Sequence, residues 1–202
     1  MGDSKQVPRE KAMEAFMDAA ERLLIEVGYA KISTRKLAEE ASANHGLVHY
    51  YFGSMEELFA QVLERFTGRL IERQREMYAR DVPFIEKWRT AMGFLEEDLA
   101  AGYPKVWFEL QALAWNRPEL RQRIVQVNAE WRAVLSESFA AALDEYARAD
   151  DEVPVAAWVS LVMTFNQGIM LERLLGIRDG HDELLSAVDS WLQRLDEGGG
   201  AP

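Results

Sequence analysis

The sequence contains no cysteine, which excludes disulfide bonds, thiolate metal sites and cysteine nucleophiles. It has only three histidines in 202 residues. The phosphate-binding loop and the motifs G-x-G-x-x-G, H-E-x-x-H and G-x-S-x-G are also absent. Because these motifs mark the common catalytic and cofactor sites, we expect no catalytic residue, no metal and no cofactor. The sequence therefore predicts a protein that is not an enzyme.

Long apolar segments are also lacking. No uninterrupted apolar run approaches the ~18–20 residues that span a bilayer. The first residues, MGDSKQVPREKAMEAF, lack the apolar stretch of a signal peptide. With 49% hydrophobic and 28% charged residues, the composition is typical of a soluble globular protein. We therefore expect a cytoplasmic location and no membrane partner.

Basic residues are outnumbered, and the net charge is −11. The excess is uneven, because residues 1–53 hold seven Lys/Arg against eight Asp/Glu and most of the acidic excess follows residue 80. Salt screens exposed charges beyond about 10 Å at 0.1 M. The overall negative charge therefore does not exclude a local DNA-binding surface in the N-terminal part.

Apolar residues recur at steps of three and four along almost the whole chain, which predicts amphipathic helices. After a loose polar tail over residues 1–8, we expect helices over about 9–27, a short stretch behind Ser33, 45–51, 54–80, 84–100, 104–115, 118–147, 153–175 and 181–196. Neither strand alternation nor an internal repeat is found. The predicted fold is all-α, with about nine helices.

Residues 41–58 read ASANHGLVHYYFGSMEEL. This short segment combines histidines, aromatic residues, an asparagine and glycines, which is unusual for a short amphipathic helix. Two short helices separated by a tight turn, both leaning on a longer amphipathic helix, form a helix-turn-helix. The second helix of such a pair lies in the major groove of DNA. Val48 and Phe52 are four residues apart and are expected in the core, which leaves the polar and aromatic residues facing the DNA.

Each candidate residue of this segment has a chemical role. Asn44 and His45 can reach base edges or phosphates, and Leu47 can touch a thymine methyl group. Gly46 lets the backbone approach closely. The remaining candidates can bind phosphate oxygens, which sets position rather than sequence preference; they are His49, Tyr50 and Tyr51 on the second helix and Thr34, Arg35 and Lys36 on the first.

Residues 12–66 resemble the DNA-binding region of the TetR family of bacterial transcriptional repressors. The residues that fit the family pattern are Gly28, Tyr29, Thr34, Leu37, Ala38, Gly46, Val48, Tyr51, Phe52, Ser54 and Leu58. The resemblance implies an N-terminal three-helix DNA-binding domain, placed here at 9–53. It also implies a C-terminal helical bundle for ligand binding and dimerisation, placed at 54–197, with helix 54–80 joining the two.

Three positions depart from the family pattern. Ser42 replaces the usual turn glycine, and since serine tolerates a left-handed conformation less well, we expect a slightly different turn geometry. His49 replaces a common tyrosine, which shortens the reach to phosphate. Met55 replaces a common phosphate-contacting lysine, so DNA binding is expected to be weaker or to rely on Lys36 or Arg9 instead.

All six tryptophans lie beyond residue 87, in the part where the resemblance implies a pocket for a small hydrophobic effector. Asn166 and Gln167 interrupt an apolar helix, and they could bond a ligand, satisfy a partner helix or face solvent. The candidate lining residues are Phe94, Trp107, Phe108, Trp115, Trp131, Met163, Phe165, Asn166, Gln167 and Met170.

The last two predicted helices carry broad apolar faces that need a cover. In the TetR family such helices form the interface of a homodimer. The candidate interface residues are Val155, Trp158, Val159, Val162, Leu184, Leu185, Val188, Trp191, Leu192 and Leu195.

The resemblance therefore implies a ligand-responsive transcriptional regulator that acts as a repressor. It would bind a pseudo-palindromic, double-stranded DNA operator as a homodimer and release it when the effector binds. The alternative, favoured by His49 and Met55, is a small-molecule-binding helical module whose DNA binding is weakened or lost.

Overall fold

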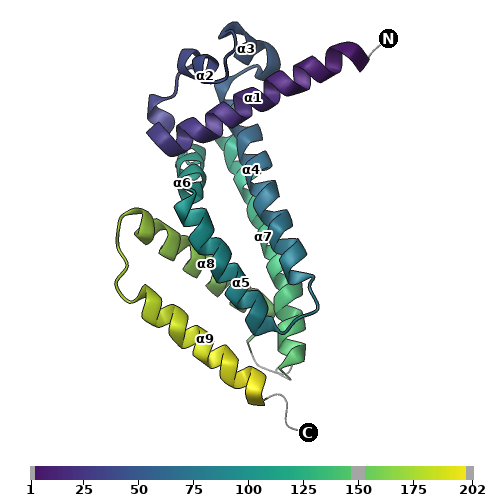
Figure 1. Cartoon of the computed structure of the whole chain (residues 1–202), viewed down its shortest axis with the longest axis vertical. Helices are drawn as coiled ribbons and strands as arrows, with labels where there is room; N and C mark the ends of the chain where they lie inside the picture. Colours follow the sequence, from purple (N-terminus) through teal and green to yellow (C-terminus); the bar gives the residue numbers. More distant parts are fainter. Residues whose placement is uncertain (1–2, 147–152, 199–202) are drawn as a thin grey trace. The chain divides into compact units, whose positions relative to one another are not determined.

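The computed structural model describes residues 3–146 and 153–198, with side chains from residue 9 onward. These residues form nine α-helices and one short 3-10 helix, and no strand (Figure 1). The elements are α1 Asp3–Val27, η1 Tyr29–Lys31, α2 Thr34–Glu40, α3 Gly46–Phe52, α4 Met55–Tyr78, α5 Phe84–Ala100, α6 Tyr103–Ala114, α7 Pro118–Glu145, α8 Val155–Leu174 and α9 His181–Gly198. The all-α fold predicted from the apolar spacing is confirmed.

The start of the first helix differs from the prediction. We expected a loose tail over residues 1–8, whereas α1 begins at Asp3; residues 1 and 2 lie outside the described residues. The apolar stripe begins only at residue 12, so the polar turns before it carry no periodic signal. The predicted end of the seventh helix at residue 147 also lies outside the described residues, and α7 ends at Glu145.

The chain divides into two compact units. Unit 1 comprises residues 1–68 and 105–127, and unit 2 comprises residues 69–104 and 128–202. Helices α4 and α7 therefore contribute one part to each unit. The predicted boundary after residue 53 does not coincide with this division, because the apolar stripe of α4 continues the core of the three N-terminal helices.

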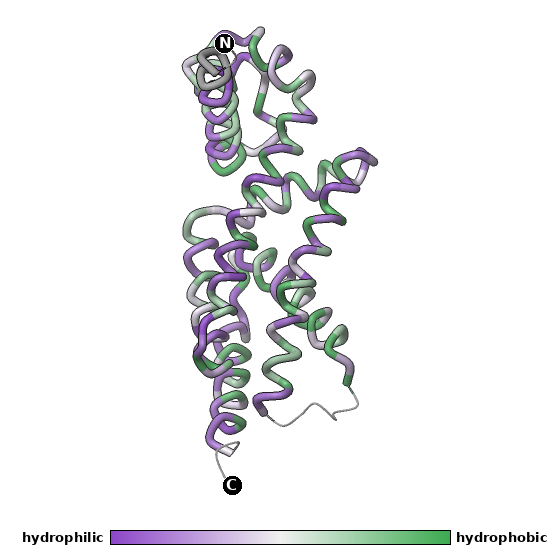
Figure 2. Tube along the Cα trace, turned by 90° about the vertical axis from the view of Figure 1, so that its right-hand side faces the viewer, coloured by the Kyte–Doolittle hydropathy of each residue, from purple (hydrophilic) through white to green (hydrophobic). Residues whose placement is uncertain are grey.

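Unit 1 has a densely buried core. Phe16 of α1, Phe59 and Leu63 of α4 and Leu110 of α6 are almost completely shielded from solvent. Polar and apolar residues alternate along the helices throughout the chain (Figure 2), as amphipathic helices require. The first part of α4 and α6 thus completes the core that α1, α2 and α3 begin.

Unit 2 is built around α5, which packs against both α8 and α9. Its core contains Phe84, Ile85 and Trp88 of α5 together with Ala142 of α7 and Leu192 of α9. The Phe84 ring lies edge-on to the Phe139 ring, with centroids 5.4 Å apart. The Phe84 backbone N–H donates to the Glu145 carboxylate at 2.9 Å, which gives a partner to a helix-start amide.

The connection between α8 and α9 is held by two buried side chains, Arg173 and His181. Arg173, near the end of α8, donates to Glu96 and, at 3.3 Å, to Asp182 at the start of α9. The His181 ring contacts the Glu172 carboxylate at 2.7 Å through Nε2. Because Arg173 and His181 are both buried, these contacts fix the two helices as the antiparallel pair drawn in Figure 1.

Helix α8 is apolar enough to correct one expectation. By length and composition alone, Val155–Leu174 could cross a membrane, although little of it is buried within the described structure. The amides Asn166 and Gln167 had divided this stretch in the sequence, so no long apolar run was apparent. A helix that packs against a second protein has the same composition, so this feature alone is weak grounds for a membrane span.

Candidate nucleic-acid interface

The position of α3 is set by packing between aromatic rings. The Phe16 ring of α1 meets the Phe52 ring at an angle of 89°, with centroids 6.2 Å apart, and the Tyr51 ring at 6.4 Å. Val48 and Phe52 are buried, which confirms their predicted core role. With this face of α3 fixed to α1, the opposite face is left to solvent.

The exposed face of α3 carries the predicted DNA-contacting residues. Asn44, His45, Gly46, His49 and Tyr50 are exposed, and Tyr50 has 74% of its surface accessible. The Tyr50 hydroxyl and ring are therefore accessible for contact with another molecule. The structure therefore brings these candidates together on one accessible surface of unit 1.

Leu47 and Tyr51 are only half-buried and lie at the edges of this surface. The Tyr51 ring touches both Phe16 and, with centroids 5.1 Å apart, Tyr50. The Tyr51 side chain thus belongs partly to the core of unit 1. Its packing supports the more exposed Tyr50 ring.

The turn between α2 and α3 is stabilised by local hydrogen bonds. The Ser33 hydroxyl accepts from the backbone N–H of Lys36 and caps α2. The Asn44 side-chain oxygen accepts from the backbone N–H of Gly46 at 2.9 Å. The amide NH₂ of Asn44 can still contact a base or a phosphate, and the second lone pair of its oxygen can still accept from a donor on a base.

Ser42 adopts the left-handed conformation, with a φ of 52°. We expected the replacement of the usual glycine to change the turn geometry. Instead the backbone adopts the conformation that glycine favours, and serine bears the steric cost of about 1 kcal/mol. Backbone bonds on either side, such as Ala43 N–H to Ala38 carbonyl at 2.9 Å, hold the turn in this conformation.

The exposed His49 ring is held by the backbone at the end of α3. Its Nδ1 lies 3.1 Å from the Gly53 carbonyl oxygen. A carbonyl oxygen only accepts hydrogen bonds, so Nδ1 must carry the proton. In the neutral ring Nε2 is then an acceptor, which suits an amino group on a base edge better than a phosphate oxygen.

The predicted contacts on α2 lie beside this surface. Thr34 and Lys36 are half-buried and Arg35 is exposed. Arg35 pairs with Glu39 at 2.9 Å, but both side chains are largely in solvent. An exposed pair four residues apart contributes little to stability, so Arg35 can exchange Glu39 for a DNA phosphate at low cost.

Only Gly53 and Ser54 separate α3 from α4. The Ser54 hydroxyl accepts from the Glu57 backbone N–H at 3.0 Å, which is the capping bond that the S-x-x-E spacing predicts. Met55, at the first position of α4, is half-buried. It presents no charge where a lysine would attract phosphate.

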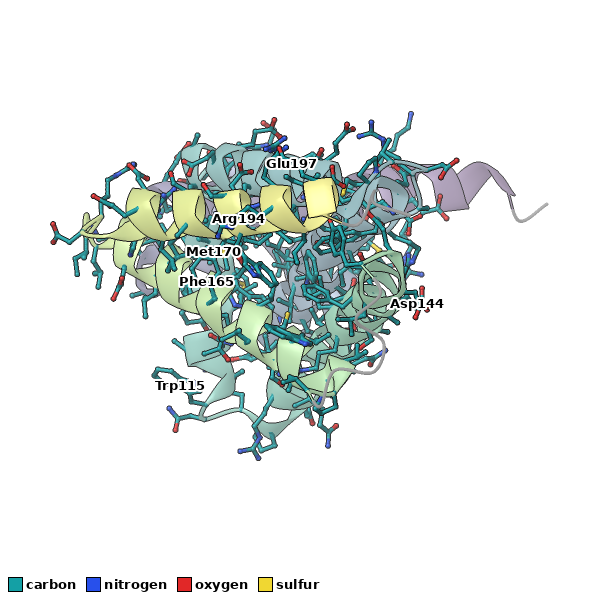
Figure 3. All side chains as sticks on the ribbon, turned by 90° about the horizontal axis from the view of Figure 1, so that it is seen from below. Trp115, Asp144, Phe165, Met170, Arg194 and Glu197 are labelled. Carbon is teal, nitrogen blue, oxygen red and sulfur yellow. The ribbon has the colours of Figure 1, made fainter. Side chains whose placement is uncertain are left out.

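The predicted ligand-binding residues do not form one cluster within one unit. Trp107, Phe108 and Trp115 belong to unit 1 and the other seven to unit 2. Trp115 follows the last residue of α6 and is 73% exposed, and Figure 3 shows its side chain pointing outward. The Phe94 ring is covered by the Arg73 guanidinium at 4.1 Å, so a cation occupies one of its faces.

On α8, the candidates Met163, Phe165, Asn166, Gln167 and Met170 are all half-buried, as is Trp131 of α7. Phe165 packs against the core of unit 2. Figure 3 shows Phe165 and Met170 on the side of α8 where α9 lies. Apolar spacing could not separate such core residues from ligand contacts, because both need the same side chains.

The predicted dimer residues fall into two groups. Val159 and Leu192 are buried within one protomer, and Leu185, Val188 and Leu195 pack against its core. Their own chain thus covers Val159 and Leu192 almost fully and the other three partly. Leu184 and Trp191, by contrast, are 46% and 45% exposed, while Val155, Trp158 and Val162 are half-buried.

Residues 16–62, which contain α2, α3 and the beginning of α4, match the family described as bacterial regulatory proteins, tetR family. The N-terminal part of the chain therefore resembles the DNA-binding region of the TetR family. The all-helical fold of the chain is also that of solved structures. A TetR transcription regulator from Haloarcula marismortui superposes with a TM-score of 0.72 at 18% identity, covering 94% of this chain and 98% of that one.

Relatives with similar sequences are also transcriptional regulators by name. The regulator PksA of Bacillus subtilis is 25% identical over 120 residues, 57% of this chain and 58% of PksA. A transcriptional repressor of Mycobacterium tuberculosis is 32% identical over 105 residues, 50% of this chain and 55% of the repressor. The chain thus spans little more than half the length of the curated relatives it matches.

A third similar structure has a ligand. The regulator FadR of Bacillus subtilis, solved in complex with stearoyl-CoA, superposes with a TM-score of 0.72 at 19% identity. It covers 92% of this chain and 98% of its own length. At this identity the likeness establishes the fold alone.

Proposed function

We propose that this protein is a TetR-family transcriptional repressor that binds a pseudo-palindromic operator as a homodimer. A small hydrophobic effector bound in unit 2 releases the DNA. The observation that carries this proposal is the exposed polar and aromatic face of α3, held on a closed core with Tyr50 at 74% exposure.

The DNA contacts divide by chemistry. His45 and the acceptor Nε2 of His49 suit base edges in the major groove. Arg35, Lys36 and the Tyr50 hydroxyl suit phosphate oxygens, which position the helix without reading sequence. The near-neutral charge of residues 1–53 is sufficient because only these local donors touch the duplex.

The homodimer forms through α8 and α9. Leu161 and Leu171 on α8 and Leu184 and Trp191 on α9 are exposed, although large apolar side chains normally find a cover. A two-fold axis buries the same patch on both protomers. It also places two copies of α3 about 34–36 Å apart, one turn of the duplex, as a palindromic operator requires.

The effector is a hydrophobic small molecule. The FadR structure with stearoyl-CoA and the 26% identical fatty acid metabolism regulator of Bacillus subtilis support an effector with an acyl chain. Half-buried Met163, Phe165 and Met170 on α8 provide a flexible apolar lining. The effector acts only through its preference for one conformation of the protein.

The expected lack of enzyme activity and the expected cytoplasmic location are both consistent with a transcriptional repressor. Regulators of this family are not enzymes as a class, and the proposed activity needs neither catalytic residue nor cofactor. The proposed site of action is the cytoplasm, where bacterial DNA lies.

Electrophoretic mobility shift with DNA from upstream of the gene tests the proposal. A specific complex at low salt is expected. His45→Ala should change the preference at one base position by about 1–3 kcal/mol, while Tyr50→Phe should weaken all sequences alike. If no upstream fragment shifts at low salt, the alternative of a small-molecule-binding module without DNA binding is correct.

A further inference from the structure

The C-terminal end of α1 is held by a side chain from α6. The last carbonyl groups of a helix lack partners within the helix and carry a partial negative charge. Lys105 of α6 donates to one of them, the Ile25 carbonyl, at 2.5 Å. A lysine at this position satisfies the carbonyl and also opposes the charge of the helix end.

A second side chain of α6 binds the backbone immediately after α1. The Glu109 carboxylate accepts from the Tyr29 backbone N–H at 3.2 Å. Gly28, between α1 and Tyr29, has a φ of 76°, and a Cβ atom there would lie 2.6 Å from Glu109 Oε1. Glycine therefore permits both the turn and the close approach of the carboxylate.

Lys105 and Glu109 are four residues apart and lie on the same face of α6. In the sequence this spacing is typical of an ordinary ion pair on a helix surface. In the structure the two side chains instead bind two backbone groups of opposite polarity. We call Lys105, Glu109 and their partners at Ile25 and Tyr29 the α6 clamp. Two directional bonds fix both the position and the rotation of α6 against the end of α1.

In sequence, α6 directly follows helix α5 of unit 2, and its clamp side chains bind the backbone just before α2 and α3. Only Ala101 and Gly102, which has a φ of 77°, separate α6 from α5 of unit 2. On its other side, the clamped Tyr29 is four residues from Ser33, the cap of α2. Figure 1 shows α6 beside the end of α1.

We propose that Lys105 and Glu109 are positioning residues that hold the helix-turn-helix in its operator-binding orientation. They act from α6, independently of the continuous helix α4. Neither residue touches DNA in this proposal, which rests on the proposed dimeric operator binding. Releasing the clamp leaves the recognition surface intact but allows the two copies of α3 to sample several separations.

Spin-label distance measurement on the full-length dimer tests this directly. Because the chain has no cysteine, the exposed Glu14 of α1 can be changed to cysteine to give one label per protomer. The clamp variants are Glu109→Ala and Lys105→Met, and Glu109→Gln and Lys105→Arg keep an acceptor and a donor. The double variant Glu119→Ala, Arg121→Met removes one charge of each sign from exposed positions on α7 as a matched control.

The parent protein and the control should give one narrow distance distribution. Glu109→Ala and Lys105→Met should broaden it and weaken operator binding by about tenfold. The salt dependence of binding should be unchanged, because no phosphate contact is lost. The conservative variants should restore both properties, which a general loss of folding would not allow.

Clamp variants with the parent distribution and the parent affinity would overturn the positioning role while leaving the dimeric regulator intact. A parent protein with no dipolar signal at micromolar concentration would overturn the dimer, and the positioning role with it. Melting curves by circular dichroism identify any variant whose weaker binding comes from unfolding.

Discussion

The two units of this protein differ in how completely they bury their own apolar side chains. All the largest fully buried side chains among the described residues lie in unit 1, from Phe16 in α1 to Leu110 in α6. Eight of the eleven large apolar or aromatic side chains exposed in the described part lie in unit 2. Unit 1 therefore buries its own large apolar side chains. Unit 2 leaves many of them exposed, where they can contact another molecule.

Polar groups and charge show the same contrast. Unit 1 carries 12 Lys/Arg against 13 Asp/Glu, and unit 2 carries 11 against 21. Within unit 2, buried atoms such as Gln74 Oε1 and Trp158 Nε1 have no hydrogen-bond partner. Burial also raises the pKa of Asp98, although Arg73 donates to it. The near-neutral unit suits contact with DNA, and the acidic unit suits a position away from it.

The largest expected effect tests whether unit 1 is complete in itself. Phe16→Ala removes the ring on which Tyr51 and Phe52 pack and leaves a cavity. It should lower the free energy of unfolding by about 3–5 kcal/mol and abolish operator binding. Urea unfolding followed by circular dichroism measures the change. A loss below about 1 kcal/mol would mean that the core of unit 1 is not as tightly packed as the structure indicates.

The next effect tests whether unit 2 is completed by a second copy. Trp191→Asp places a charge on the exposed face of α9 and should weaken the dimer by at least about 2 kcal/mol. Trp115→Asp is the matched control, since Trp115 is exposed but lies outside α8 and α9. Sedimentation equilibrium measures both. Equal dimer stability in the two variants would place the interface elsewhere.

The third prediction has a smaller expected effect and concerns the charge difference between the two units. Met55→Lys restores a cation at the start of α4 in each of two protomers. The slope of log affinity against log salt should become steeper by about two units. Fluorescence anisotropy with labelled operator DNA at several salt concentrations gives this slope. An unchanged slope would show that residue 55 does not reach a phosphate.

The smallest effect concerns the turn of the helix-turn-helix. Ser42→Gly relieves the left-handed strain and should stabilise unit 1 by up to about 1 kcal/mol, reduced by the greater unfolded-state freedom of glycine. Operator binding should not change, because the backbone already adopts the glycine-like conformation. Thermal melting tests this, and a destabilised variant would mean that the Ser42 side chain contributes a stabilising contact.

The sequence predicted some features well because each had a local cause. The ends of α4 followed from the Ser54 cap and the continuous apolar stripe, and the buried Val48 and Phe52 followed from their four-residue spacing. The exposed face of α3 could be predicted because α3 is too short to bury two faces. Its exposed residues were the ones left over after the core was assigned.

Other features could not be predicted because one pattern has several uses. The apolar residues of α9 serve both the core, as Leu192 does, and the exposed face, as Trp191 does. Lys105 and Glu109 have the spacing of a surface ion pair, and only the fold shows that they bind backbone atoms 80 residues away. The hydrogen bond between His49 Nδ1 and the Gly53 carbonyl also depends on how α3 ends, which the sequence pattern did not indicate.

The most direct test of the regulator is the mass of its complex with DNA. Sedimentation velocity of the protein with a duplex from its own upstream region gives the number of chains per duplex. We predict two 23.1 kDa chains on one duplex at low salt. A single chain per duplex would contradict the dimer, and free protein beside free DNA would contradict the DNA-binding function itself.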